Sequence, residues 1–124
     1  MRTLTVLLIL AFVHLSAATL VRDDVVGRWQ LDMSRVTDAQ RDAANGVVEG
    51  FGITLTSRIG RVTWSADDMV AGMWRIDDAT ETTATLVIST KSGTEHHYHL
   101  TINGDQMNVT EAPHGLPLAR AGAN

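Results

Sequence analysis

The chain has 124 residues, no cysteine, and ten Lys and Arg against fourteen Asp and Glu, which gives a formal net charge of −4. This length is typical of one domain, and the lack of cysteine excludes disulfide bonds and thiol chemistry. The negative charge argues against nucleic acid and against anionic membrane surfaces, because both are bound through clustered Lys and Arg. We therefore expect one globular domain that binds neither.

Residues 1–18 predict a secretory signal peptide. Arg2 supplies a positive charge near the start, an apolar stretch covers residues 4–15, and Ser16-Ala17-Ala18 supplies small residues at the cleavage site. These are the three parts that define such a peptide. We expect cleavage after Ala18 and a secreted or periplasmic location.

An uncleaved membrane anchor is the alternative interpretation of this segment. The polar side chains of His14 and Thr19 interrupt its second half, whereas a spanning helix needs about 20 predominantly apolar residues. Cleavage is therefore favoured, and we expect no stable membrane association after it. Residues 19–24 then form a short lead-in, and residues 25–120 form the folded domain.

The remaining chain alternates between apolar and polar residues in seven stretches. Such alternation predicts β-strands with one buried face. The seven stretches are 25–32, 51–59, 61–66, 72–76, 82–90, 95–102 and 106–110. Arg28, Thr54 and Arg61 are among the residues that this alternation turns outward.

Short turns connect these strands. Asn103-Gly104 is the strongest hairpin motif, and residues 59–61, 77–80 and 91–94 are further short reversals rich in Gly, Asp and Ser. Consecutive strands joined in this way form an antiparallel up-and-down meander. Such a sheet must pack against another layer or close on itself, so we expect an all-β fold.

One segment predicts a short helix straight after the first strand. Thr37 and Gln40 fit a capping box, and Ala39, Ala43, Val47 and Phe51 then recur every four residues. Gly50 is placed to stop the helix. We expect this helix to lie across one open end of a barrel.

A six-residue motif, G-x-W-x-[LI]-D, occurs at residues 27–32 and again at residues 72–77. Glycine leaves room beside an inward indole, and aspartate ends the strand, so similar strand requirements explain both copies. A G-x-W motif on the first strand of an exported meander resembles the lipocalin superfamily. It most resembles the short bacterial lipocalin-like domains, over most of residues 24–120. The resemblance implies a small closed barrel, with Trp29 at its closed end beneath Arg120.

The resemblance also implies non-catalytic binding of a small apolar ligand inside the barrel. A barrel of about eight strands is just wide enough to hold one small ligand or to be filled by side chains. The candidate lining residues are Trp29, Phe51, Trp64, Trp74, Tyr98 and Met107. If they fill the interior instead, a secreted protein-interaction or inhibitor module with a protein partner is the alternative function.

A third hypothesis is a metal-binding module. Glu95, His97 and His99 share one face of a strand, and His114 follows in a later loop. Two imidazoles side by side suit a metal ion. That face is opposite Tyr98, however, so a solvated face is the favoured interpretation, and we predict neither a resident metal nor another cofactor.

Enzymatic activity is not expected. Acidic pairs such as Asp67-Asp68 and Asp77-Asp78 point in opposite directions on a strand or form turns, so neither pair is a catalytic dyad. The chain contains no G-x-S-x-G, P-loop, H-E-x-x-H or EF-hand motif.

Overall fold

The computed structural model describes residues 18–122. The predicted signal peptide, apart from Ala18, lies outside these residues. No helix in the described part is long and apolar enough to cross a membrane.

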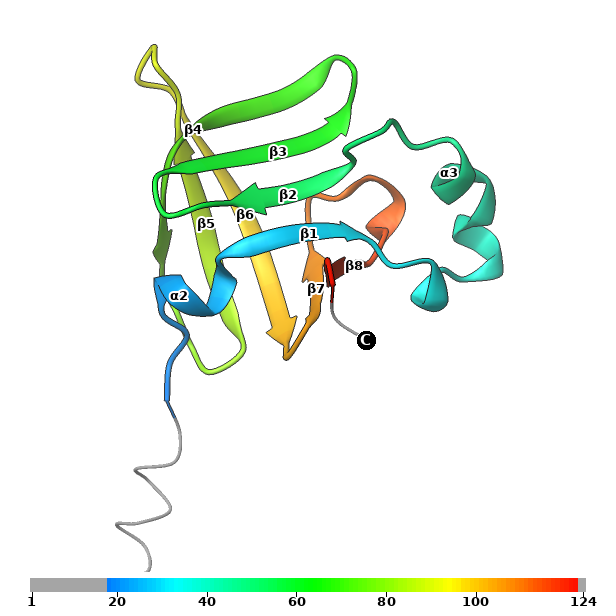
Figure 1. The fold of residues 1–124 in the computed structure, drawn as a ribbon, viewed down its shortest axis with the longest axis horizontal. Coiled ribbons are helices and arrows are strands. Elements are labelled where there is room, and N and C mark those ends of the chain that lie inside the picture. The colour runs from blue at the N-terminus through cyan, green and yellow to red at the C-terminus, as the bar shows by residue number, and fades with distance from the viewer. Residues whose placement is uncertain (1–17, 123–124) are drawn as a thin grey trace, which may run out of the picture.

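Eight antiparallel strands form one closed barrel in sequence order (Figure 1). Each strand pairs with the next, and the last returns to pair with the first. The strands are β1 Gly27–Leu31, β2 Gly52–Leu55, β3 Ile59–Ser65, β4 Asp68–Asp77, β5 Thr83–Ser89, β6 Glu95–Asn103, β7 Gln106–Val109 and β8 Leu118–Arg120. The predicted all-β meander is confirmed. Only β8 had no predicted strand, because three residues are too few for alternation to show.

The alternation of each strand sorts its residues between the barrel interior and the solvent. In β6, for example, Tyr98, Leu100 and Ile102 are buried, while His97 and His99 between them are exposed. Inward residues from all eight strands form one core cluster. Val87 of β5 is fully buried although it lies outside that cluster, in a cross-strand row between Arg75 and His97.

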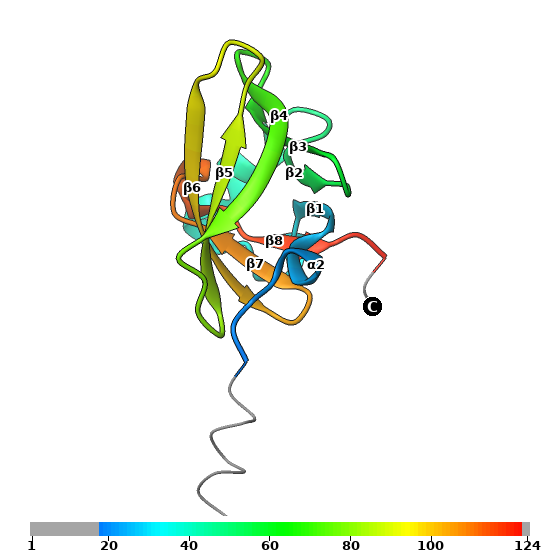
Figure 2. The same ribbon diagram turned by 90° about the vertical axis from the view of Figure 1, so that its left-hand side faces the viewer.

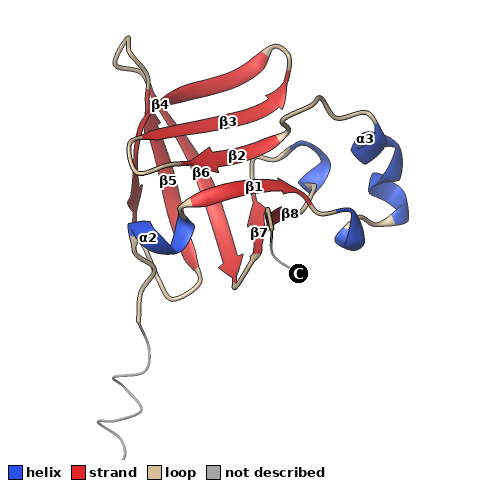
Figure 3. Ribbon diagram, viewed as in Figure 1, coloured by secondary structure: helices blue, strands red, loops and turns tan. Residues whose placement is uncertain are grey.

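Short helical segments lie at both ends of β1 (Figure 3). The segment before β1 is α2 Arg22–Val25, which leads into β1 (Figure 2); the Arg120 side chain of β8 reaches the Asp24 carbonyl in it. The segments after β1 are η1 Met33–Arg35, η2 Asp38–Gln40 and α3 Arg41–Asn45, and η3 Pro113–Gly115 precedes β8.

The predicted helix after β1 is present but shorter than its pattern. The Thr37 backbone N–H donates to Gln40 Oε1 over 3.0 Å, as a capping box requires. The α-helical part ends at Asn45, followed by Gly46, and does not reach Gly50. Glycine inside a helix costs about 1 kcal/mol relative to alanine, and Phe51 is buried in the barrel core. The packing of Phe51 therefore overrides its four-residue spacing.

Two predictions about the first hairpin are wrong. The strand predicted to reach Ile59 ends at Leu55, and the turn predicted at residues 59–61 is part of β3. Gly60 serves packing instead, because a Cβ atom there would lie 3.0 Å from Leu55 Cδ2 and from Trp74 Cβ. The chain reverses just before β3, where the Thr56 hydroxyl accepts a hydrogen bond from the Ile59 backbone N–H.

Candidate functional site

The six residues predicted to line a pocket lie inside the barrel and are all buried. Their exposed fractions are 1% for Trp29, 5% for Phe51, 6% for Trp64, 5% for Trp74, 6% for Tyr98 and 0% for Met107. All six belong to the single core cluster. They therefore meet as packing partners.

Three of the six form an aromatic group. The ring centroids of Phe51 and Trp64 are 5.3 Å apart, and those of Trp64 and Tyr98 are 6.4 Å apart. Both separations are within the range of favourable aromatic pairs. Burial, with smaller contributions from the charges of Asp68 and Glu111, raises the pKa of Tyr98 to about 12. The phenol is therefore protonated and uncharged at neutral pH.

Trp29 is held from two sides at the end of the barrel near α2. Its Nε1 donates to the Val25 carbonyl over 2.9 Å. The Arg120 guanidinium carbon lies 4.3 Å from the indole centroid, a cation–π contact. Arg120 also donates to the backbone carbonyls of Asp24 and Val26. The placement of Arg120 over Trp29, which the lipocalin resemblance implies, is confirmed.

Trp74, in the second copy of the motif, has an equivalent arrangement. The Arg22 guanidinium carbon lies 3.9 Å from its ring centroid, and its Nε1 donates to the Thr56 carbonyl over 2.8 Å. Arg22 was not among the residues predicted from the sequence. The second copy of the G-x-W motif was the available signal, because it implies a second arginine over its tryptophan.

The candidate metal ligands of β6 are on the outer face, where they pair with other side chains. Glu95 accepts a hydrogen bond from Arg75 over 3.0 Å, and His97 Nε2 lies 3.6 Å from Glu95 Oε1. His114 lies in η3. Over residues 18–122, no group of three or more His, Cys, Asp or Glu side chains could hold a metal ion.

His99 is engaged by a different carboxylate. Its Nδ1 lies 2.7 Å from Glu111 Oε2, and its backbone N–H donates to Glu111 Oε1 over 2.6 Å. Burial raises the pKa of Glu111. The hydrogen bonds that its carboxylate accepts, chiefly the two with His99, act in the opposite direction, and the net result is a lowered pKa. These contacts hold His99 on the outside of β6 against the segment after β7.

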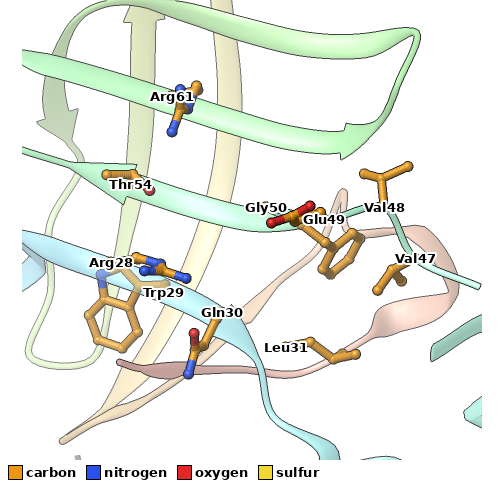
Figure 4. A pocket seen from close by; sticks show the side chains of 11 residues that line it. Arg28, Trp29, Gln30, Leu31, Val47, Val48, Glu49, Gly50, Thr54 and Arg61 are labelled. Carbon is orange, nitrogen blue, oxygen red and sulfur yellow. The ribbon is translucent and has the colours of Figure 1, made fainter. Parts of the chain in front are cut away.

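A groove of about 470 Å³ lies outside the barrel, between β1–β3 and the segment 47–51 (Figure 4). One part of it is basic and polar, with Arg28, Thr54 and Arg61. The other part is apolar, with Leu31, Val47, Val48 and Phe51. Of the six inner residues, Trp29 and Phe51 also border this groove, and Trp74 borders two smaller hollows. Trp64, Tyr98 and Met107 border none of the five hollows described over residues 18–122.

The alternation of the sequence correctly places Arg28, Thr54 and Arg61 on the outer face, but it does not predict that they form one site. Arg28 pairs with Thr54 across β1 and β2, and Thr54 pairs with Arg61 across β2 and β3. The three residues come from separate parts of the chain, so only the strand register makes them one row. The outward positions of the three predicted strands were the available signal.

Searches against models of protein families, curated proteins and solved structures found no match for this chain. The structure itself defines a closed eight-stranded antiparallel β-barrel, which is compatible with a lipocalin-like fold.

Proposed function

We propose that this chain is an exported, non-catalytic binding protein with a lipocalin-like barrel, and that it binds its partner on the outside of a filled barrel. The observation that carries the proposal is the burial of all six candidate lining residues, none of which exposes more than 6% of its surface. The groove between β1–β3 and residues 47–51 supplies a concave surface for binding.

The lipocalin-like assignment is supported by one contact and one topology. Gly27 and Trp29 begin the first strand, with Arg120 of the last strand stacked on the indole. The eight strands close in sequence order, as in an up-and-down barrel of that class. Export is supported by the composition of residues 1–18. We expect N-terminal sequencing of the secreted protein to find Thr19 as its first residue.

A small apolar ligand inside the barrel is the competing proposal. It requires an internal void beside Trp64, Trp74 and Tyr98. The Trp64 ring packs on both Phe51 and Tyr98, and both Trp29 and Trp74 already donate their indole N–H groups to backbone carbonyls. The packing of these side chains therefore favours binding at the exterior.

The two proposals differ in whether the barrel takes up an apolar probe. Benzene binds apolar cavities in protein cores, so we expect that a benzene titration leaves the interior NMR signals of the unmodified protein unchanged. Met107→Ala is the positive control, since truncating a fully buried methionine leaves a cavity and destabilises the fold by about 2–5 kcal/mol. Benzene binding by the unmodified barrel, at residues such as Trp64 and Tyr98, would exclude the filled-barrel proposal.

A further inference from the structure

We propose that the outer groove of β1–β3 binds a carboxylate that carries an apolar chain. The proposal rests on the external binding mode above and names its ligand class. Arg28 and Arg61 hold the carboxylate over Thr54, and the chain of the ligand lies on the apolar half of the groove.

The strand register brings two guanidinium groups within reach of one carboxylate. Arg28, Thr54 and Arg61 occupy one cross-strand row. Neighbouring strands are about 4.8 Å apart, so the two arginine Cα atoms are on the order of 10 Å apart. Figure 4 shows Thr54 between the two arginines. The planar donor fork of arginine matches the two oxygens of a carboxylate.

These two arginines are free for a ligand. Over residues 18–122, neither Arg28 nor Arg61 has an ion pair or a side-chain hydrogen bond. By contrast, the side chains of Arg22, Arg35 and Arg120 all donate to backbone carbonyls and tie separate segments together. Arg28 and Arg61 are both exposed, so their charge is directed to solvent within the groove.

The rest of the groove offers apolar surface far enough from Arg28 to contact the apolar chain of a ligand. Leu31 is three residues beyond Arg28 on β1, which is about 10 Å along the strand. Leu31, Val47 and Val48 are half-buried and all three line the groove, and Leu31 and Val47 also pack against the barrel core. A volume of about 470 Å³ is within the usual range of small-molecule sites.

The charge of the groove favours an anion. Its lining contains two arginines and one acid, Glu49, so the lining carries a net charge of +1. Figure 4 shows Glu49 next to Gly50, where the chain enters β2. A single carboxylate on the ligand neutralises this charge.

Isothermal titration calorimetry with sodium decanoate tests the proposal, with the chain from Thr19 onward and decanoate kept below its micelle concentration. We expect saturable binding at one site. Arg28→Ala and Arg61→Ala are each expected to weaken it about tenfold or more, because each removes hydrogen bonds to a charged group. Arg58→Ala, which removes another exposed arginine outside the groove, is the matched control and should leave affinity unchanged. Glu49→Gln should tighten binding, by up to about fivefold.

Two further probes separate the roles of charge and chain. Decanol lacks the carboxylate, and acetate lacks the chain. We expect each to bind more weakly than decanoate. Equal affinity of decanol or acetate would overturn the proposed ligand class.

The location of binding separates this proposal from the external binding mode on which it rests. Decanoate is expected to shift the NMR signals of residues 28, 54 and 61. Absence of decanoate binding, or binding that the two arginine variants leave intact, overturns the carboxylate proposal while a benzene-free interior still supports a filled barrel. Shifts confined to Trp64 and Tyr98 overturn both.

Discussion

Two neighbouring rows of residues on β1, β2 and β3 alternate along the same strands but differ in burial and in side-chain chemistry. The inner row is Trp29, Ile53 and Val62, each 1% exposed. The outer row, one residue away, is Arg28, Thr54 and Arg61. Alternate residues of a strand face opposite sides of a sheet, so the inner row can stabilise the fold while the outer row remains available for binding. Mutations in the two rows should therefore affect different properties.

The largest expected effect is the loss of the inner indole. Trp29→Ala removes a side chain that packs in the core and under Arg120, so we expect the free energy of unfolding to fall by about 3–5 kcal/mol. Arg28→Ala, one residue away, should change it by no more than about 0.5 kcal/mol. Urea unfolding of both variants measures the difference, and similar losses at the two positions would contradict the division between the rows.

A smaller effect is expected from overfilling the same region. Gly60→Ala places a methyl group 3.0 Å from atoms of Leu55 and Trp74, so the free energy of unfolding should fall by about 1–3 kcal/mol. Arg61→Ala on the outer row is the matched control, with a change within about 0.5 kcal/mol. Thermal unfolding compares the two, and a Gly60→Ala variant as stable as the original chain would indicate spare room in the barrel.

The smallest effect depends on pH and concerns the end of β1. Hydrogen bonds from Ser34 and then from Arg35 hold the pKa of Asp32 below its usual value. The ionised side chain therefore contributes stability that is complete above pH 4, near the pKa of an unfolded aspartate, and is lost as the pH falls through the lower folded pKa.

Asp32→Asn isolates this contribution, because asparagine does not ionise. We expect the variant to unfold at lower urea concentration than the original chain at pH 7. The gap between the two should narrow as the pH falls from 4 to 2, where Asp32 becomes protonated. A gap that stays constant across this range would show that the charge of Asp32 has no part in stability.

Local patterns were sufficient for most of the fold. Period-two alternation located seven of the eight strands, because burial of one sheet face constrains every second residue. The capping box at Thr37 and Gln40 located the helical segment correctly. The end of that segment was missed, because Phe51 is placed by its contact with Trp64, a residue on a different strand.

The candidate site was less predictable than the fold. The six residues predicted to bind a ligand lie together in the barrel core, but whether such a group surrounds a void or fills it depends on the closeness of packing. Arg22 over Trp74 and Arg28 beside Thr54 and Arg61 depend on contacts between distant segments. The motif and the alternation point to these residues one segment at a time, but they do not say which of them meet.

By itself, the sequence determined which residues face inward, because the two-residue period follows from strand geometry and the burial of apolar surface. The resemblance of its G-x-W motif to that of lipocalins also pointed to Arg120 as the partner of Trp29, a contact that the structure contains. Only the tertiary structure decided the register of β1, β2 and β3, and with it the row of Arg28, Thr54 and Arg61. Register depends on the simultaneous closure of eight strands, so it is a property of the whole barrel and not of any one segment.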